Sequence, residues 1–560
     1  MRLDPGPGSP DSGQTVRWAS ASPGEDRRRA GALLRCMGWL ALCLALRPAP
    51  GRAQTPTPAG EAQSLARVEV SGPVESFPLP AHALLRDATG RDYLLVFASS
   101  NALAQVGWSF QAIDPAAGAP ADYLLVREMR PGARAAAAAA GFRVLHDDGA
   151  QWVVRASQGE ADRLAELGFA LQRLGPQALV WTQPPRRPGK DGDPPFNAPP
   201  GPLVRAMIGQ VQTTNLHRLM RRLTGGEPTL AAGEPVLVNT RHTASGPPVR
   251  NALQSVLDRL TQLGLDVQTH DWAMSGLTNR NVVATQPGMI RSNEFVLITA
   301  HLDDAPAGAL APGADDNASG VAAVLTAASV FSQYHFDRSV RFVLFTGEEQ
   351  GLYGSAAYAA AAKAAGDNIV AVLNADMIAW DSYGKPTLKL YTRAKTMPGY
   401  TNDFVIAATF TNVVAACGLS SNLAPVLVSD GMGYSDHASF WNRGYPAICM
   451  IEDYQGDFNA YYHTTGDTMA KLNWPYFTAA VRATVATLGQ LALPVEAAPA
   501  EIIEVAAGHW APGAGIGTGV FLARGAPADA LGRARRARCG LVEGARPHPT
   551  GVAAGLFRAF

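Results

Sequence analysis

Cysteine is scarce in this sequence. The 560 residues include five cysteines, and no two of them form a Cys-x-x-Cys motif. Cys36 and Cys43 lie in an apolar N-terminal stretch, so the rest of the chain holds three widely spaced thiols, Cys417, Cys449 and Cys539. Such a set is not a disulfide framework, and at most one pair can form. Thiolate metal centres are excluded as well, so any metal chemistry must rest on imidazole and carboxylate groups.

The sequence also lacks an excess of charge of either sign. Charged residues make up 17%, and 47 basic residues balance 47 acidic ones, which gives a formal net charge of +0. This balance leaves no electrostatic footprint for nucleic acid or an anionic membrane. Beyond the N-terminal region, no apolar segment reaches the ~20 residues that span a bilayer. With 47% hydrophobic residues, the chain can bury a large core and form more than one domain.

Residues 1–53 have the composition of a targeting segment. A basic run at 27–35 precedes an apolar stretch at 36–46 and the small residues Gly51 and Ala53, which is typical of a signal peptide. The apolar stretch is too short for a membrane anchor. We expect export to a secreted or periplasmic location, with a mature chain that begins after Ala53. We interpret the residues before the basic run as an over-long N-terminus.

Composition divides the remainder into four sections. Residues 54–182 alternate short apolar runs with Ala-rich or amphipathic stretches, which predicts a small α+β module. Residues 183–202 are dense in Pro and Gly and predict an exposed linker. Residues 203–495 hold all the candidate chemistry. Residues 496–560 are rich in Ala, Gly and Arg without periodicity, and we interpret them as a tail.

The section 203–495 repeats a strand, loop and helix pattern. Short apolar runs predict strands, and longer stretches predict helices between them. The expected strands lie at 281–285, 294–300, 340–346 and 369–374, and the expected helices at 249–263, 319–331 and 354–365. This order is typical of an α/β sheet with helices on both faces.

Polar side chains follow three of these strands directly. His301 follows the second strand, Glu348 and Glu349 follow the third, and Asp376 ends the last. Ligands of open α/β sheets bind at the carboxyl ends of the strands, so we expect these side chains to meet in one crevice. Each residue alone has an ordinary interpretation, because a lone His or Asp after a strand is usually a solvated loop residue or a helix cap.

Five polar segments occur together in this section of the chain. Their joint occurrence argues against five unrelated loop residues or helix caps. They read HLDD (301–304), GADDNASG (313–320), TGEEQGLYGS (346–355), NADM (374–377) and YHTTGDT (462–468). In order and approximate spacing, residues 203–495 resemble the zinc aminopeptidases of peptidase family M28, a group that includes secreted bacterial leucyl aminopeptidases. Residues 54–182 resemble the propeptide that precedes some of these catalytic domains.

This resemblance implies a zinc-exopeptidase-like mixed sheet sandwiched by helices, and a site for two zinc ions. The ligands that it implies are His301, Asp315, Glu349, Asp376 and His463. Asp315 would bridge the ions, with His301 and Asp376 on one of them. Glu348 would be the general base that takes a proton from a bridging water and returns it to the leaving amine. Imidazole and carboxylate suit Zn²⁺ at ~2.0–2.2 Å, and a bridging carboxylate can hold two ions ~3.5–4 Å apart.

Two further carboxylates are expected to support the ligands. Asp303 can accept the second ring N–H of His301, which would fix its tautomer, or it can be an exposed loop residue. Asp467 is expected to support His463 in the same way or to brace its loop. The resemblance also implies a cis peptide between Asp315 and Asp316.

The loop at 429–437 departs from the family pattern. Well-known relatives have two cysteines there that flank an oxyanion-binding tyrosine. By direct register, Asp430 and Tyr434 occupy the cysteine positions and Met432 that of the tyrosine. Tyr434 is a candidate oxyanion or substrate contact, with a packed aromatic as the alternative. We assign His437 to loop structure rather than to a metal.

These observations predict an exported, monomeric metallo-aminopeptidase that acts on the N-termini of peptides and proteins and binds neither nucleic acid nor, after signal removal, a membrane. Apolar side chains near the motifs are candidates for a pocket that takes a hydrophobic first residue: Met377, Ile378, Met432, Phe458, Tyr461 and Tyr462. Two alternatives stay open. One is a single-zinc glutaminyl cyclase of the same fold, and the other is a binding protein that has the fold without the metals.

Overall fold

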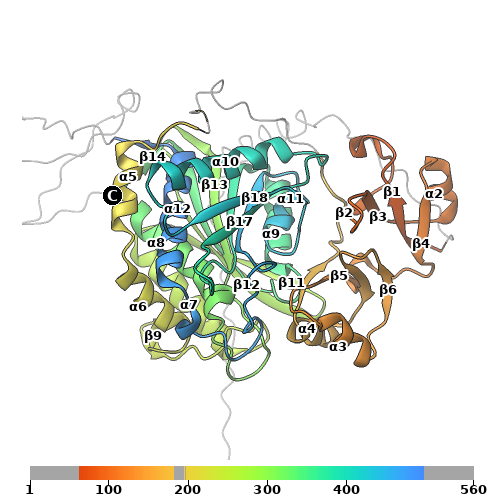
Figure 1. The fold of residues 1–560 in the computed structure, drawn as a ribbon, viewed down its shortest axis with the longest axis horizontal. Helices are drawn as coiled ribbons and strands as arrows, with labels where there is room; N and C mark the ends of the chain where they lie inside the picture. Colours follow the sequence, from red (N-terminus) through yellow and green to blue (C-terminus); the bar gives the residue numbers. More distant parts are fainter. Residues whose placement is uncertain (1–61, 182–194, 196, 497–560) are drawn as a thin grey trace, which may run out of the picture. The chain divides into compact units, whose positions relative to one another are not determined.

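The computed structural model describes residues 62–181, 195 and 197–496 (Figure 1). The expected targeting segment, most of the linker and the tail lie outside these residues. The described residues belong to one compact unit of the chain. Within them, no helix has both the length and the apolar character needed to cross a membrane.

Residues 62–181, called the module below, confirm the predicted α+β class. The module contains two antiparallel four-stranded sheets, in the orders β2-β3-β1-β4 and β6-β7-β5-β8. The strands are β1 (Ser64–Glu69), β2 (Ala81–Arg86), β3 (Asp92–Ala98), β4 (Phe110–Asp114), β5 (Tyr123–Glu128), β6 (Val144–Asp147), β7 (Trp152–Arg155) and β8 (Phe169–Arg173). The helices are α2 (Ser100–Val106), α3 (Ala133–Ala139) and α4 (Gln158–Leu167).

Residues 197–496, called the main domain below, are built on an eight-stranded sheet in the order β11-β12-β15-β13-β16-β19-β17-β18. The strands are β11 (Asp266–Met274), β12 (Leu277–Gln286), β13 (Arg291–His301), β15 (Arg338–Phe345), β16 (Asn368–Ala375), β17 (Thr387–Tyr391), β18 (Ala424–Val428) and β19 (Ala447–Glu452). Strands β15, β13, β16 and β19 are parallel, whereas β12 pairs with β15 and β17 with β19 in antiparallel fashion. The predicted mixed sheet is therefore confirmed.

Helices cover both faces of this sheet. Helices α8 and α12 lie on one side, and α9 and α11 lie on the other (Figure 1). The helices are α5 (Pro202–Gln210), α6 (Thr213–Leu223), α7 (Pro247–Gln262), α8 (Gly320–Phe331), α9 (Tyr353–Ala365), α10 (Tyr400–Ala416), α11 (His437–Trp441) and α12 (Trp474–Ala492), with a short helical segment η3 (Ala314–Ser319) before α8. Strands buried on both faces read as continuous apolar runs, which is why periodicity located the central strands correctly.

Two short strand pairs complete the main domain. They are β9 (Thr229–Ala231) with β10 (Glu234–Val236), and β14 (His335–Phe336) with β20 (Pro494–Val495). The helices predicted at 249–263, 319–331 and 354–365 correspond to α7, α8 and α9. The expected segments therefore surround the parallel centre of the sheet, where the candidate site lies.

Candidate active site

Neighbouring parallel strands deliver polar side chains to one edge of the sheet. His301 is the last residue of β13, and Asp376 directly follows β16. Nε2 of His301 lies 3.2 Å from Oδ1 of Asp376, and the hydroxyl of Ser435 donates to Oδ2 of Asp376 at 2.6 Å. Both site residues are buried. The expectation that strand ends bring these groups together is confirmed.

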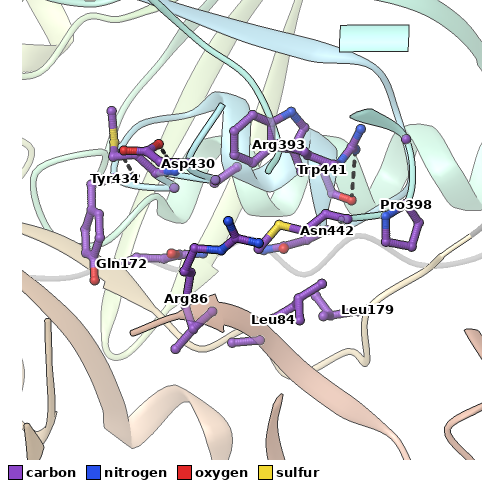
Figure 2. Close-up of a pocket in the computed structure, with 18 of the residues that line it drawn as sticks. Leu84, Arg86, Gln172, Leu179, Arg393, Pro398, Asp430, Tyr434, Trp441 and Asn442 are labelled. Carbon is purple, nitrogen blue, oxygen red and sulfur yellow. Dashed lines mark hydrogen bonds between the residues drawn. The ribbon is translucent and has the colours of Figure 1, made fainter. Parts of the chain in front are cut away.

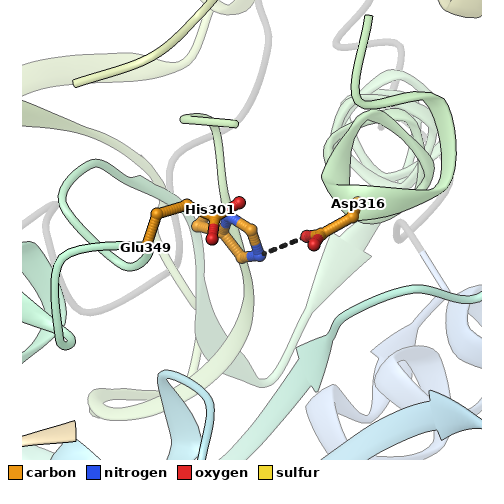
Figure 3. Close-up of side chains that lie close together, drawn as sticks. All are labelled: His301, Asp316 and Glu349. Atoms are coloured by element: carbon orange, nitrogen blue, oxygen red, sulfur yellow. Dashed lines mark ion pairs between the residues drawn. The ribbon is translucent and has the colours of Figure 1, made fainter. Parts of the chain in front are cut away.

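Asp316 lies between two imidazoles. Its Oδ1 is 3.3 Å from Nε2 of His301 (Figure 3). Its Oδ2 is 3.2 Å from Nε2 of His463. One carboxylate therefore presents a different oxygen to each ring. This is the arrangement that a carboxylate shared by two cations requires.

The structure contradicts the predicted placement of Asp315. Its carboxylate points away from the imidazoles and accepts hydrogen bonds from the Ala379 N–H at 2.9 Å and from Nδ2 of Asn459 at 3.1 Å. The backbone of Asp316 and Asn317 leaves helical geometry within η3, so neighbouring carboxylates point in different directions. The cis peptide joins Asp316 to Asn317 and not Asp315 to Asp316. The prediction was wrong by one position in both respects.

Glu348 and Glu349 lie in a turn after β15. The N–H of Gly351 donates to the carbonyl of Glu348 at 2.8 Å. The two glutamates therefore do not lie on an extended continuation of the strand. The polar Thr-Gly-Glu-Glu sequence ends the apolar run, and the chain turns there before α9 begins.

The two glutamates nevertheless take different places around the site. Oε2 of Glu349 lies 2.8 Å from Nε2 of His463. Glu348 groups instead with His301 and Asp376, with one potential ligand atom from each residue within 4.8 Å of the others. We call the six side chains gathered here the site cluster: His301, Asp316, Glu348, Glu349, Asp376 and His463.

The position of His463 is fixed by its backbone conformation and by contacts of its ring. Its backbone has a positive φ of 54°, a conformation that costs a non-glycine residue free energy and often occurs at functional sites. Its ring stacks on Tyr462 with centroids 3.7 Å apart. Nδ1 lies 2.6 Å from the carbonyl oxygen of Ala165 in the module. Sequence reasoning missed this contact, because a backbone carbonyl carries no side-chain signal.

Asp467 braces the loop beneath Asp316, which was the second of its two expected roles. Its carboxylate accepts the N–H of Asp315 at 3.0 Å and the N–H of Asp316 at 3.0 Å. The predicted support of His463 by Asp467 is not made, since the carbonyl of Ala165 takes that position. Asp467 thus fixes the backbone that carries the shared carboxylate.

Asp303 orients His301 through its main chain. Nδ1 of His301 lies 3.2 Å from the carbonyl oxygen of Asp303 and 3.9 Å from its carboxylate. The carboxylate accepts hydrogen bonds from the hydroxyl of Thr243 at 2.9 Å and from the N–H of Glu349 at 3.3 Å. The predicted partner is correct as a residue, but the nearer atom is the carbonyl. A fully buried Asp303 also rules out the exposed-loop alternative.

The site cluster concentrates negative charge in a buried place. Burial raises the pKa of Glu348 well above its ordinary value and that of Glu349 to about 7. Burial disfavours a charged His463, but the carboxylate of Glu349 outweighs it and raises the pKa of His463 to about 10. Hydrogen bonds with His301 and His463 likewise overcome burial and lower the pKa of Asp316. Protons on the two imidazoles thus balance the negative charge of the carboxylates. A bound cation would balance the same charge in their place.

The residues present fit a metal. Oε1 of Glu349 is buried and has no hydrogen-bond partner among the described residues, although buried polar atoms are normally paired. His301, Asp316 and Glu349 offer ligand atoms that lie within 4.8 Å of one another. Imidazole nitrogens and carboxylate oxygens are the donors that Zn²⁺ accepts in proteins. In the described part of the chain, Cys417 and Cys449 are free thiols and neither belongs to the site cluster.

The cavity at the site cluster is closed by the module. It has a volume of about 350 Å³, and its apolar lining comes from both parts of the chain. The module contributes Met129, Phe169, Ala170 and Leu171, and the main domain contributes Met377, Tyr434, Ile451 and Tyr462. Of the candidates for a hydrophobic pocket, Met377 and Tyr462 line this cavity, whereas Ile378 belongs to the main core.

The loop at 429–437 contributes to the lining of a second cavity, of about 870 Å³ (Figure 2). Asp430 accepts the N–H of Met432 at 3.0 Å, and Tyr434 lines both cavities. The hydroxyl of Tyr434 donates to Oε1 of Gln151 in the module at 3.1 Å. His437 bonds to the carbonyl oxygen of Met432 at 2.8 Å, as predicted for a residue that supports the loop.

A mixed sheet with a buried imidazole and carboxylate cluster at its parallel strand ends is typical of a hydrolytic enzyme with a metal-ligand set. Residues 281–488 match the family model described as peptidase family M28. The region that carries the site cluster therefore matches an M28 peptidase domain.

Similar proteins include a probable leucine aminopeptidase of Arthroderma otae, which is 28% identical over 310 residues, covering 52% of this chain and 76% of that protein. Leucine aminopeptidase 1 of Coccidioides posadasii is 31% identical over 233 residues, covering 40% and 57%. Among solved structures, the LapA aminopeptidase of Legionella pneumophila aligns with a TM-score of 0.48 and 19% identity, over 67% of this chain and 99% of that one.

Proposed function

We propose that the protein is an exported zinc aminopeptidase, which hydrolyses residues from the N-termini of peptides with two zinc ions. The observation that carries the proposal is the position of Asp316, with one carboxylate oxygen facing each imidazole. The similarity to leucine aminopeptidases supports the choice of substrate class. The composition of residues 1–53 supports export.

The proposed ligands divide into two sets that share one residue. One ion would be held by His301, Asp316 and Asp376, and the other by Asp316, Glu349 and His463. When bound, the ions supply a Lewis acid for the scissile carbonyl and favour deprotonation of the attacking water. Asp316 therefore takes the shared role that the sequence assigned to Asp315.

Glu348 is the proposed general base. Its carboxylate lies with His301 and Asp376 at the cavity, and it is not the one that pairs with His463. It would accept a proton from the attacking water and deliver that proton to the leaving amine. Burial favours the protonated form of its side chain, which suits a group that must hold the proton between the two transfers.

We further infer that the module is a propeptide-like cover of this site. Three contacts support this inference: the carbonyl of Ala165 faces His463, the guanidinium of Arg130 donates to the carbonyl of Tyr462, and Met129 lines the cavity. A peptide N-terminus needs the same space. The covered chain would therefore be latent.

Paired substitutions test the position of the shared carboxylate. We expect Asp316→Asn to lose at least one zinc ion and the hydrolysis of Leu-p-nitroanilide, because a neutral amide is a poor bridging ligand. Asp315→Asn is the matched control: its side chain faces Ala379 and Asn459, so the zinc content should stay at two. Elemental analysis of the purified chains gives the metal content, and activity is measured after separation from the module.

The same measurements decide between the proposed function and its alternatives. One zinc per chain together with cyclisation of N-terminal Gln peptides would identify a glutaminyl cyclase. A folded chain that binds no metal would identify a binding protein. Two zinc ions without aminopeptidase activity in the uncovered enzyme would refute the proposal.

A further inference from the structure

Three arginines line a cavity of the main domain that shares no residue with the cavity at the site cluster. Arg218 and Arg222 stand one turn apart on α6, and Arg259 lies in the last turn of α7. The cavity has a volume of about 850 Å³, including space open to solvent, and is lined by the end of α5 together with α6, α7 and α8. Helices α6, α7 and α8 lie side by side in Figure 1. Among the residues that the structure describes, no aspartate or glutamate lines it.

Three donors in this cavity are buried and have no partner. They are Nε of Arg222, Nε of Arg259 and the hydroxyl of Thr326 on α8, none of which has a hydrogen-bond partner among the described residues. Buried polar groups are almost always paired, so unpaired donors on three side chains that line one cavity indicate a missing acceptor. By contrast, Arg221 on the same helix is exposed and pairs with Glu227 at 2.6 Å.

The arginines also repel one another. Burial lowers the pKa of Arg259, and the neighbouring charges of Arg222 and Arg218 lower it further. Basic residues near a helix C-terminus are favoured by the helix dipole, which explains why α6 and α7 end with arginines. The dipole does not explain why two Nε donors are buried without an acceptor. A multiply charged anion would remove both the repulsion and the unpaired donors.

We propose that this cavity binds a small phosphate-class oxyanion, either inorganic phosphate or the phosphate group of a small soluble monoester. Guanidinium groups match phosphate oxygens in charge and geometry, and a hydroxyl adds a further donor. Gln212, Asn215 and Ser329 supply polar groups elsewhere on the lining. The volume exceeds that of a phosphate ion, which leaves room for an organic remainder. Because the cavity is a hollow between several helices, its shape fits a small ligand better than a flat lipid surface.

Phosphate binding to matched arginine variants of the full chain tests this proposal. Isothermal titration with inorganic phosphate and with glycerol phosphate, at constant ionic strength set by chloride, should give saturable binding to the unaltered chain. Arg259→Gln and Arg222→Gln should each weaken binding by about tenfold or more, since each removes one charge-assisted contact. Arg221→Gln is the control on the same helix and should change affinity by less than about twofold. Tighter binding of the monoester than of phosphate would identify the organic source.

A second readout separates a binding site from a structural role. Without phosphate and at low salt, Arg259→Gln should raise the melting temperature because it relieves the repulsion, and it should remove the further rise that phosphate causes in the unaltered chain. If Arg259→Gln does not fold, Thr326→Val serves in its place and should weaken phosphate binding. Equal stabilisation by chloride, unchanged phosphate affinity in these variants, or binding only to phosphatidylglycerol vesicles would overturn the proposal. Phosphate bound at the catalytic metals would be insensitive to all three variants.

Discussion

At the residue scale, two consecutive aspartates have different tasks. The carboxylate of Asp316 faces two imidazoles, whereas that of Asp315 accepts hydrogen bonds from Ala379 and Asn459. Asp467 holds the N–H groups of both. Asp315 and Asp467 thus fix the loop, so that Asp316 does not have to rearrange to reach a cation. Such fixed placement of a ligand by surrounding hydrogen bonds is a common property of metal sites.

The role of Glu348 predicts a variant that binds metal but does not turn over. Glu348→Gln keeps the shape of the side chain and removes its ability to accept a proton. We expect zinc content and melting temperature to be unchanged, and kcat to fall by about 10²-fold or more. Glu234→Gln, at an exposed position on β10, is the control and should keep full activity. Loss of zinc from Glu348→Gln would mean that Glu348 is a ligand and not the base.

The sequence motifs located most of the site cluster, and their limits have physical causes. His301, Asp376 and His463 are each the only residue of their kind at a strand end or in a motif, so pattern was sufficient to place them. Adjacent aspartates satisfy the same pattern, and only the backbone angles at residues 316 and 317 decide which one faces the imidazoles. The contact between His463 and Ala165 joins residues far apart in the sequence through a main-chain atom.

At the scale of elements, the central strands were predictable and their order was not. Strands β12, β13, β15 and β16 each contain an apolar run, and the structure has them at the expected positions. Strand β19 pairs with both β16 and β17 although it comes later in the chain than β18. Such an order depends on which faces pack together, and periodicity contains no information about it. Periodicity likewise gave no information about the turn at Glu348.

Helix α11 predicts a pH effect on stability. Burial lowers the pKa of His437, its first residue, to about 4. The unfolded ring has a pKa near 6.5, so the unfolded state binds more protons as pH falls below that value. Neutral His437 therefore contributes stability above pH 6.5, and the contribution is lost as pH falls towards 4. The lost contribution amounts to about 3 kcal/mol at most.

Urea unfolding of the chelator-treated chain at pH 7, 5.5 and 4 checks this expectation. The unaltered chain should be more stable than His437→Gln at pH 7, because the ring bonds to the carbonyl of Met432. The difference in unfolding free energy between the two should shrink as pH falls. His335→Gln, at an exposed ring on β14, is the control. A constant difference for His437→Gln would show that the ring does not titrate in this range.

At the scale of the whole molecule, the module and the main domain share a hydrophobic cluster. Leu95, Tyr123 and Met129 of the module pack in one cluster with Met432 and Tyr454 of the main domain. Burial of apolar surface contributes on the order of 25 cal/mol per Å², so this contact holds the two parts together without the linker. The module can therefore cover the site even when the linker no longer joins it to the main domain.

This arrangement predicts two steps in activation. Proteolysis within residues 183–202 should by itself change the hydrolysis of Leu-p-nitroanilide little, since the hydrophobic cluster keeps the module in place. Activity should rise by about tenfold or more once the module is removed by size-exclusion chromatography in mild denaturant and the main domain is returned to buffer. Adding the purified module back should lower the activity again. Unchanged activity after complete removal of the module would refute its inhibitory role.

The carbonyl of Ala165 has a consequence for the order of events in maturation. Because it accepts the hydrogen on Nδ1 of His463, the proton that a cation would displace is the one on Nε2, beside Asp316 and Glu349. The covering module thus holds this imidazole in the tautomer that a cation needs. If the module is a propeptide, we therefore expect zinc to bind while the module is in place, so that the released enzyme already holds its metal.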